Sequence, residues 1–189
     1  MKSTIILFLA TLILASCAIA PTTYTPPSDA SVAASKYTVI LDKSFNEAWA
    51  ALISHAASSF FAIDQFEKDS GLMTLSFGSS NPAQFVDCGY WNVQNGYSGN
   101  YASYMYRTFD ATLSGKMNIL VNEIDDHTSE VRVNARYILS APPNTWSFDT
   151  GSSDSENVGT QAAYGTSSSI RTCIPTYDAE NSILEAMMK

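Results

Sequence analysis

The chain has 189 residues, of which 46% are hydrophobic and 15% charged, and its formal net charge at pH 7 is −8. An apolar share of this size is sufficient for one folded domain with its own core. The acidic balance argues against binding to nucleic acid, which requires a basic surface. It also argues against electrostatic adhesion to anionic lipids.

The first 16 residues have the features of a bacterial lipoprotein signal peptide. Lys2 provides a positive start, and the apolar run of about ten residues after it is shorter than the roughly 20 that a spanning helix needs. The sequence Leu-Ala-Ser-Cys at 14–17 resembles a lipobox, which implies that Cys17 is acylated and becomes the mature N-terminus. The alternative is an ordinary secretory signal that is cut near Ala20 and discards Cys17.

Acylation would make the protein a membrane-bound lipoprotein of the bacterial cell envelope. Cleavage removes the charge of Lys2 and takes the net charge from −8 to −9, so the attachment must come from acyl chains such as palmitate, at roughly 0.8 kcal/mol per buried methylene. Ala18, where an aspartate would be the retention signal, resembles the pattern of lipoproteins that reach the outer membrane. We therefore expect a location in the outer membrane, facing the periplasm.

Residues 17–36 are rich in Pro, Thr, Ser and Ala without hydrophobic periodicity. This composition predicts a disordered tether between the lipid and the domain. A single folded domain is expected over residues 37–189.

Two further cysteines, Cys88 and Cys173, form an even pair once Cys17 carries lipid. In an oxidising compartment such a pair predicts a disulfide, which would close a loop of about 85 residues and stabilise the fold by roughly 4 kcal/mol. The alternative is two separate thiols, one of them buried. His55 and His127 are not spaced as metal ligands, so neither a metal nor another cofactor is expected.

Hydrophobic patterning predicts a strand at 37–41 and then a helix at 44–60, whose start matches a capping box of Ser44 and Glu47. The apolar positions expected to form the buried face of this helix are Phe45, Ala48, Trp49, Leu52, Ile53, Ala56, Ala57 and Phe60. A hairpin is expected next, with strands at 61–66 and 72–77 joined by a turn at Lys68–Gly71.

Two long alternating runs, at 108–124 and 131–139, predict antiparallel strands with one solvated face. A closing helix is expected from about Thr176, with Ala179, Ile183, Ala186 and Met187 on its apolar side. Long loops are expected at 78–106 and 142–170. Asp149, Asp154 and Glu156 in the second loop lack the ligand spacing of an EF-hand and are expected to be solvated.

These elements predict an α+β fold of order β-α-β-β-β-β-α, an antiparallel sheet with an N-terminal and a C-terminal helix on one face. The first loop contains a possible binding surface of exposed aromatic residues. Its members are Tyr90, Trp91, Tyr97, Tyr101 and Tyr104. Alternatively, these aromatics fold back onto the sheet.

The motif Phe45-Asn46-Glu47-Ala48-Trp49, followed by residues 60–77 and the order of the elements, is similar to domains of the BamC-type lipoproteins. Those are accessory subunits of the outer-membrane β-barrel assembly machinery, with a helix-grip α+β fold. The segment 85–89, together with Thr172-Cys173 before a terminal helix, also resembles small envelope lipoproteins of this shape. BamC-type proteins have two such domains and this chain has room for one, so the resemblance transfers no functional residue.

The sequence contains no G-x-S-x-G, C-x-x-C, Walker or Rossmann motif. We therefore expect no catalytic residue and a non-catalytic interaction or assembly module that binds an envelope protein. The partner would occupy either a groove between helix 44–60 and the terminal helix or the tyrosine-rich loop. One alternative is a glycan- or peptidoglycan-binding lipoprotein that uses residues 90–106, and another is a hydrolase built from carboxylates alone.

Overall fold

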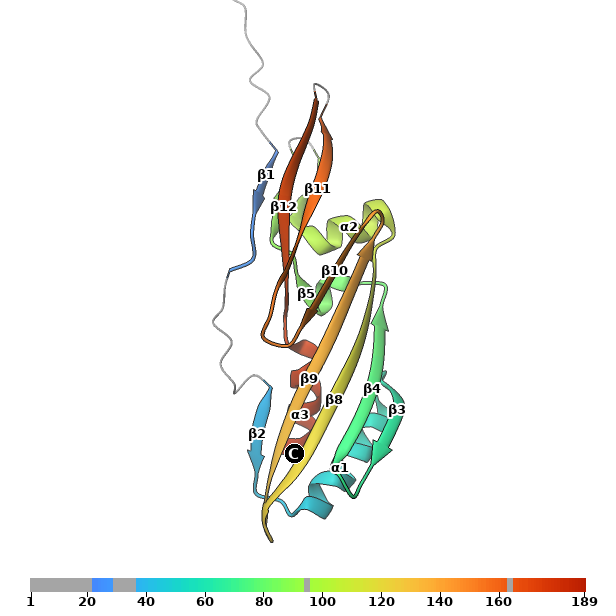
Figure 1. Cartoon of the computed structure of the whole chain (residues 1–189), viewed down its shortest axis with the longest axis vertical. Coiled ribbons are helices and arrows are strands. Elements are labelled where there is room, and N and C mark those ends of the chain that lie inside the picture. Colours follow the sequence, from blue (N-terminus) through green and yellow to red (C-terminus); the bar gives the residue numbers. More distant parts are fainter. Residues whose placement is uncertain (1–21, 29–36, 94–95, 163–164) are drawn as a thin grey trace, which may run out of the picture.

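A computed structural model describes residues 22–28, 37–93, 96–162 and 165–189. The expected α+β class is confirmed, because these residues form three α-helices together with sheets whose strand pairs are antiparallel (Figure 1).

The main sheet has six strands. In spatial order they are β10 (Asn144–Asp149), β9 (Thr128–Ala141), β8 (Thr112–Asp125), β4 (Leu72–Ser79) and β3 (Ala62–Glu67), with β2 (Thr38–Leu41) also paired to β9. Strands β10 and β2 pair with different parts of the same edge of β9. Between them Thr150 N donates to Ala135 O (2.8 Å), and Val133 N donates to Tyr37 O (2.8 Å). That edge of β9 is therefore covered along most of its length.

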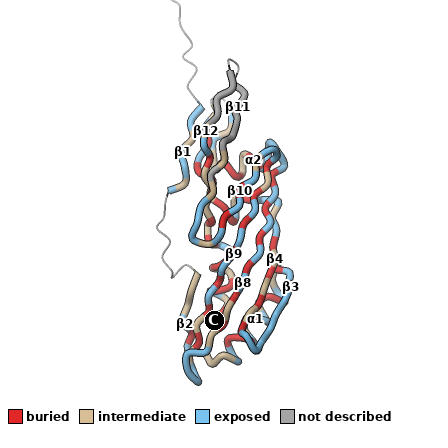
Figure 2. Tube along the Cα trace, in the orientation of Figure 1, coloured by how far each residue is buried: buried red, intermediate tan, exposed pale blue. Residues whose placement is uncertain are grey.

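Strands β8 and β9 alternate between buried and exposed residues over their length, as Figure 2 shows. Their buried face is apolar apart from Ser129, and their exposed face carries residues such as Lys116, Asn118, Asn134 and Arg136. A strand with one wet face needs this alternation, so the sequence pattern fixes which face meets the core.

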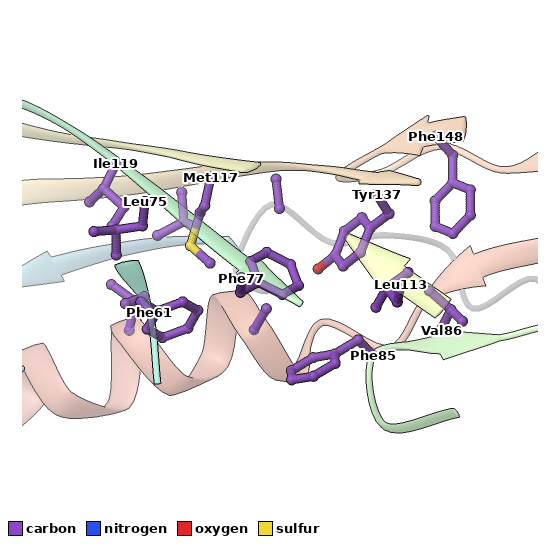
Figure 3. Close-up of a cluster of buried hydrophobic side chains, with 14 of the residues drawn as sticks. Phe61, Leu75, Phe77, Phe85, Val86, Leu113, Met117, Ile119, Tyr137 and Phe148 are labelled. Carbon is purple, nitrogen blue, oxygen red and sulfur yellow. The ribbon is translucent and has the colours of Figure 1, made fainter. Parts of the chain in front are cut away.

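Helices α1 (Phe45–Ser58) and α3 (Asp178–Met188) cover the apolar face of the sheet (Figure 1). The capping box of α1 is confirmed, since Glu47 N donates to Ser44 Oγ and Ser44 N donates to a Glu47 carboxylate oxygen. Figure 3 shows the core between the sheet and the helical layer, where aromatic rings such as Phe77 and Tyr137 meet at a centroid distance of 5.8 Å.

The prediction of long loops at 78–106 and 142–170 is wrong, because both regions contain regular secondary structure. The first region contains a 3-10 helix η2 (Pro82–Gln84), three short strands, β5 (Val86–Asp87), β6 (Tyr90–Asn92) and β7 (Ser98–Asn100), and the start of α2 (Tyr101–Phe109). The second contains β10, β11 (Asp154–Ala162) and the first part of β12 (Gly165–Pro175). The strands of the first region are too short to show a period, and half of the residues of β11 and β12 are Ser, Thr, Gly or Asn, so neither region has a strong hydrophobic pattern.

Part of the expected tether is also ordered, because Thr23–Thr25 form strand β1, which pairs with β6. β6 also pairs with β7, and β12 pairs with both β11 and β5. The prediction of a disordered tether is therefore wrong for residues 23–25. The sheet of β1, β6 and β7 and the sheet of β11, β12 and β5 form one end of the molecule (Figure 1).

Gly115 on β8 makes room for two aromatic rings of the core. It lies opposite Phe77 on one side and Tyr137 on the other, and a Cβ at this position would lie 2.1 Å from Phe77 Cζ. Only a residue without a side chain fits beneath the Phe77 ring.

We predict that Gly115→Val destabilises the protein by about 1–3 kcal/mol, because the added methyl groups force the Phe77 ring out of its place. The free energy of unfolding by denaturant measures this. Ser114→Val, one residue away on the exposed face, is the control and should change stability by no more than about 0.5 kcal/mol. Equal effects of the two substitutions would contradict the packing argument.

Candidate interaction surface

The tyrosine-rich segment is a folded unit whose aromatic residues point mainly inward. Trp91 and Tyr101 are buried, Tyr97 and Tyr104 are half-buried, and Tyr90 is 50% exposed. The expected binding surface is therefore wrong for Trp91 and Tyr101. The alternative, in which the aromatics fold back into the protein, describes most of the segment.

Contacts between the rings explain this burial. The centroid of the Tyr101 ring is 5.6 Å from that of Trp91 and 5.9 Å from that of Tyr104, and the Tyr97 and Tyr104 rings are 5.4 Å apart. Tyr101 and Tyr104 are three residues apart on α2, whose first turn is capped by the Asn100 side chain. That i, i+3 spacing and the capping residue are the sequence signals that could have revealed the helix.

The centre of this unit is Arg171 of β12, a residue that the sequence did not single out. Its side chain is 3% exposed, and its guanidinium carbon lies 4.2 Å from the ring centroid of Tyr24 and 4.4 Å from that of Trp91. The Tyr101 ring follows at 5.4 Å. These distances are those of cation–π interactions, each worth roughly 0.5–2 kcal/mol when the cation is desolvated.

Tyr24 attaches strand β1 to this centre. Its hydroxyl donates to Thr172 O (3.2 Å) and accepts from Thr172 N (3.0 Å), while its ring covers Arg171. Gly89, with φ of +79°, allows the chain to approach closely, since a Cβ there would lie 2.2 Å from Thr25 O. We call this arrangement of Tyr24, Trp91, Tyr101, Arg171 and Thr172 the arginine clamp.

The predicted disulfide between Cys88 and Cys173 is present, with a sulfur–sulfur distance of 2.06 Å. It joins β12 to the turn between β5 and β6, and both cysteines are fully buried. Cys173 and Arg171 are two residues apart on one strand, so the bond also holds Arg171 against Trp91. Cys17, the predicted lipidation site, lies outside the described residues.

Glu180 on α3 is a fully buried carboxyl group. Tyr137 donates its hydroxyl hydrogen bond to Glu180 Oε2, and the Thr150 hydroxyl lies 2.8 Å from Glu180 Oε1. Burial raises the pKa of Glu180, an effect that its hydrogen bonds to Tyr137 and Thr150 oppose. A raised pKa is common in catalytic acids, but both oxygens of this carboxyl bond to the protein's own side chains, which gives it a role in joining α3 to the sheet.

Four large apolar side chains of α1, β3 and the link between them are exposed. They are Ile53, Phe60, Ile63 and Phe66, and we call them the apolar edge patch. The expected burial of Ile53, Ala57 and Phe60 is therefore wrong. Ile63 and Phe66 lie opposite the buried residues Leu75 and Met73, so both project to the side of the sheet that carries α1.

Strand β3 is an edge of the main sheet, and within the described residues no strand pairs with its outer side. All six of its residues are exposed, and Phe66 reaches 61%. The edge has some protection from a bulge after Ile63 and from Asp64, which pairs with Lys116 at 3.1 Å. The backbone beyond the bulge and the two apolar side chains remain available to a partner.

The groove expected between helix 44–60 and the terminal helix is closed, because α1 and α3 contact one another. Ser182 Oγ lies 3.4 Å from His55 Nε2 across this contact.

The outer face of the sheet has a polar hollow of about 520 Å³. Its lining residues are Lys116, Asn118, Asn134, Ala135, Arg136 and Asp149. The cations of this hollow are paired, Arg136 with Asp149 at 3.1 Å and Lys116 with Asp64. Asp149 thus belongs to a strand rather than to the solvated loop that the sequence predicted.

In the described part of the chain, no group of three or more His, Cys, Asp or Glu residues could hold a metal ion. No helix among the same residues has both the length and the hydrophobicity that crossing a bilayer requires.

Substituting Glu180 with Gln should change how stability depends on pH. The folded-state pKa of Glu180 is raised, so the stability that its neutral form contributes is complete below the unfolded-state pKa and is lost as pH rises through the folded-state pKa. Relative to Glu180→Gln, the wild-type free energy of unfolding should therefore fall as pH rises above the ordinary range of a glutamate pKa. A Glu180→Gln profile that ran parallel to wild type would contradict the assignment.

Replacing Arg171 with Leu should lower the free energy of unfolding by about 1–3 kcal/mol, because three rings lose their cation. Denaturant unfolding with the disulfide intact measures the effect. Arg132→Leu is the matched control, since Arg132 is exposed and pairs with Glu130 at 3.3 Å, and it should cost about 0.5 kcal/mol or less. An Arg171→Leu protein as stable as wild type would show that the rings pack equally well without the charge.

Comparison of the chain with protein-family models, with curated proteins and with solved structures gave no significant match. The similarity to BamC-type domains therefore stays a prediction from the sequence. The function has to be argued from the surfaces described above.

Proposed function

We propose that this protein is a lipid-anchored accessory protein of the bacterial envelope that binds another protein and catalyses no reaction. The lipobox-like residues 14–17 support the anchor. The disulfide between Cys88 and Cys173 supports an oxidising compartment such as the periplasm, because disulfides are rare in reducing compartments.

The observation that carries the interaction role is the open edge of β3 beside the apolar edge patch. An unpaired edge strand offers a row of backbone donors and acceptors to a partner strand, and flanking apolar side chains supply pockets for specificity. Covering Phe66 would remove a large apolar side chain from water, worth roughly 1.5–3 kcal/mol for complete burial. The proposed partner is a protein segment that adds to β3 as a strand and covers Ile63 and Phe66.

The similarity to BamC-type domains supports a more specific form of this proposal, an accessory role in outer-membrane protein assembly. That form places the protein in the outer membrane with its domain in the periplasm. The chain has room for one such domain, so it would act as a single docking module.

A glycan-binding role through residues 90–106 has less support. Trp91 and Tyr101 are buried in the arginine clamp and cannot reach a ligand, and Tyr90, at 50%, is the most exposed of the five proposed aromatics. Sugar stacking on one tyrosine would be a small surface for a specific site.

We expect a photo-crosslinking amino acid at Phe66 to capture a partner in intact envelopes, because the side chain would lie inside the interface. Mass spectrometry of the adduct identifies the partner. The matched control is Ile138, which is 41% exposed on the opposite face of the sheet and should give no such adduct.

The same captured partner should be lost from pull-downs with Phe66→Asp and retained with Ile138→Asp. Both side chains are exposed, so neither substitution should alter the far-UV circular dichroism. Undiminished binding by Phe66→Asp would contradict the proposed surface.

A further inference from the structure

We infer that the end of the domain formed by β1 and the outer parts of β11 and β12 lies on the membrane surface, with lipid headgroups as its partner. This inference rests on the proposed acylation of Cys17. It adds an orientation, which the lipid anchor alone does not give.

The first step is the short reach between the lipid and the clamp. Five residues, 18–22, separate Cys17 from Thr23 at the start of β1. Fully extended, this connection spans at most about 20 Å, whereas a free tether from residue 17 to residue 36 would span about 65 Å. The arginine clamp therefore reduces the possible distance between membrane and domain about threefold.

The second step is where the clamp lies in the fold. Tyr24 bonds to Thr172 of β12, and β1 lies beside the hairpin of β11 and β12 at one end of the molecule (Figure 1). The turn between β8 and β9 lies at the opposite end (Figure 1). A lipid attached close to β1 must bring the hairpin end toward the bilayer.

The third step is the charge of the two ends. Residues 157–170, which include the outer parts of β11 and β12, contain no Asp, Glu, Lys, Arg or His. The opposite end is acidic, with Glu123, Asp125, Asp126 and Glu130 around the β8–β9 turn. In a chain of net charge −8, an uncharged end can approach anionic headgroups without the repulsion that the acidic end would meet.

This orientation also suits the apolar edge patch. Strand β3 and helix α1 lie in the half of the molecule that contains the β8–β9 turn (Figure 1). With the hairpin end on the bilayer, the patch faces away from the membrane and toward soluble or membrane-bound partners.

The test uses the full-length acylated protein in vesicles of phosphatidylethanolamine and phosphatidylglycerol. A photo-crosslinking amino acid is placed at Gln161 in β11 or at Asp126 in the β8–β9 turn, and lipid adducts are measured by mass spectrometry. We expect adducts at Gln161 to exceed those at Asp126 at least fivefold. Equal yields at the two positions would overturn the inference.

Two variants test the role of the clamp. Inserting about 20 Gly and Ser residues between Ala20 and Pro21 leaves the fold intact and adds about 25 Å of flexible reach. The excess of lipid adducts at Gln161 over those at Asp126 should then disappear. Tyr24→Ala should weaken the excess as well, because it removes the ring and the hydroxyl that hold β1. An excess that survived both changes would overturn the assignment to a short, clamped connection.

The anchor itself is checked separately, by the mass of the mature N-terminus and by flotation with vesicles. A wild-type protein that is acylated and floats but shows no excess at Gln161 overturns the orientation and leaves the anchor in place. A protein that is not acylated at Cys17 overturns both. Neither result depends on the crosslinking at Phe66 that tests the protein partner.

Discussion

The arginine clamp depends on a positive charge that has been removed from water without a carboxylate to pair it. Among the described residues no salt bridge reaches Arg171; its Nη1 donates to Ile170 O at 3.3 Å, and its guanidinium also hydrogen-bonds to the Tyr101 side chain. The electron-rich faces of Tyr24, Trp91 and Tyr101 replace part of the lost hydration. These rings come from β1, β6 and α2 and also contact one another, so the buried cation completes an aromatic cluster that joins the three elements.

Three features of the fold could be predicted because each depends on a local sequence pattern or on the number of cysteines. The capping box at Ser44 lies within four residues of sequence, the alternation of β8 and β9 repeats over many residues, and the even pair of Cys88 and Cys173 follows from counting. The clamp could not be predicted in this way. Its Arg171 looks like an ordinary polar strand residue, and the aromatic rings that justify its burial are distant in sequence.

The apolar edge patch shows a different limit of sequence patterns. The spacing of Ile53 and Phe60 relative to Trp49 is that of a buried helix face, but periodicity does not say where the neighbouring sheet ends. Because β3 is the last strand of the main sheet, no further strand in the described part of the chain covers the side chains at this side of α1. Glu180 is the reverse case, a charged residue type that is buried because Tyr137 and Thr150 happen to lie where its oxygens need donors.

The clamp also imposes an order on the maturation of the chain. Tyr24 and Thr172 are 148 residues apart, so β1 cannot dock until almost the whole chain is in the compartment where it folds. Until then β1 is not part of the fold, so the proposed cleavage and acylation at Cys17 would act before this strand has docked. Late closure of this long-range contact would thus separate the proposed processing of the N-terminus in time from the docking of β1 as a structural strand.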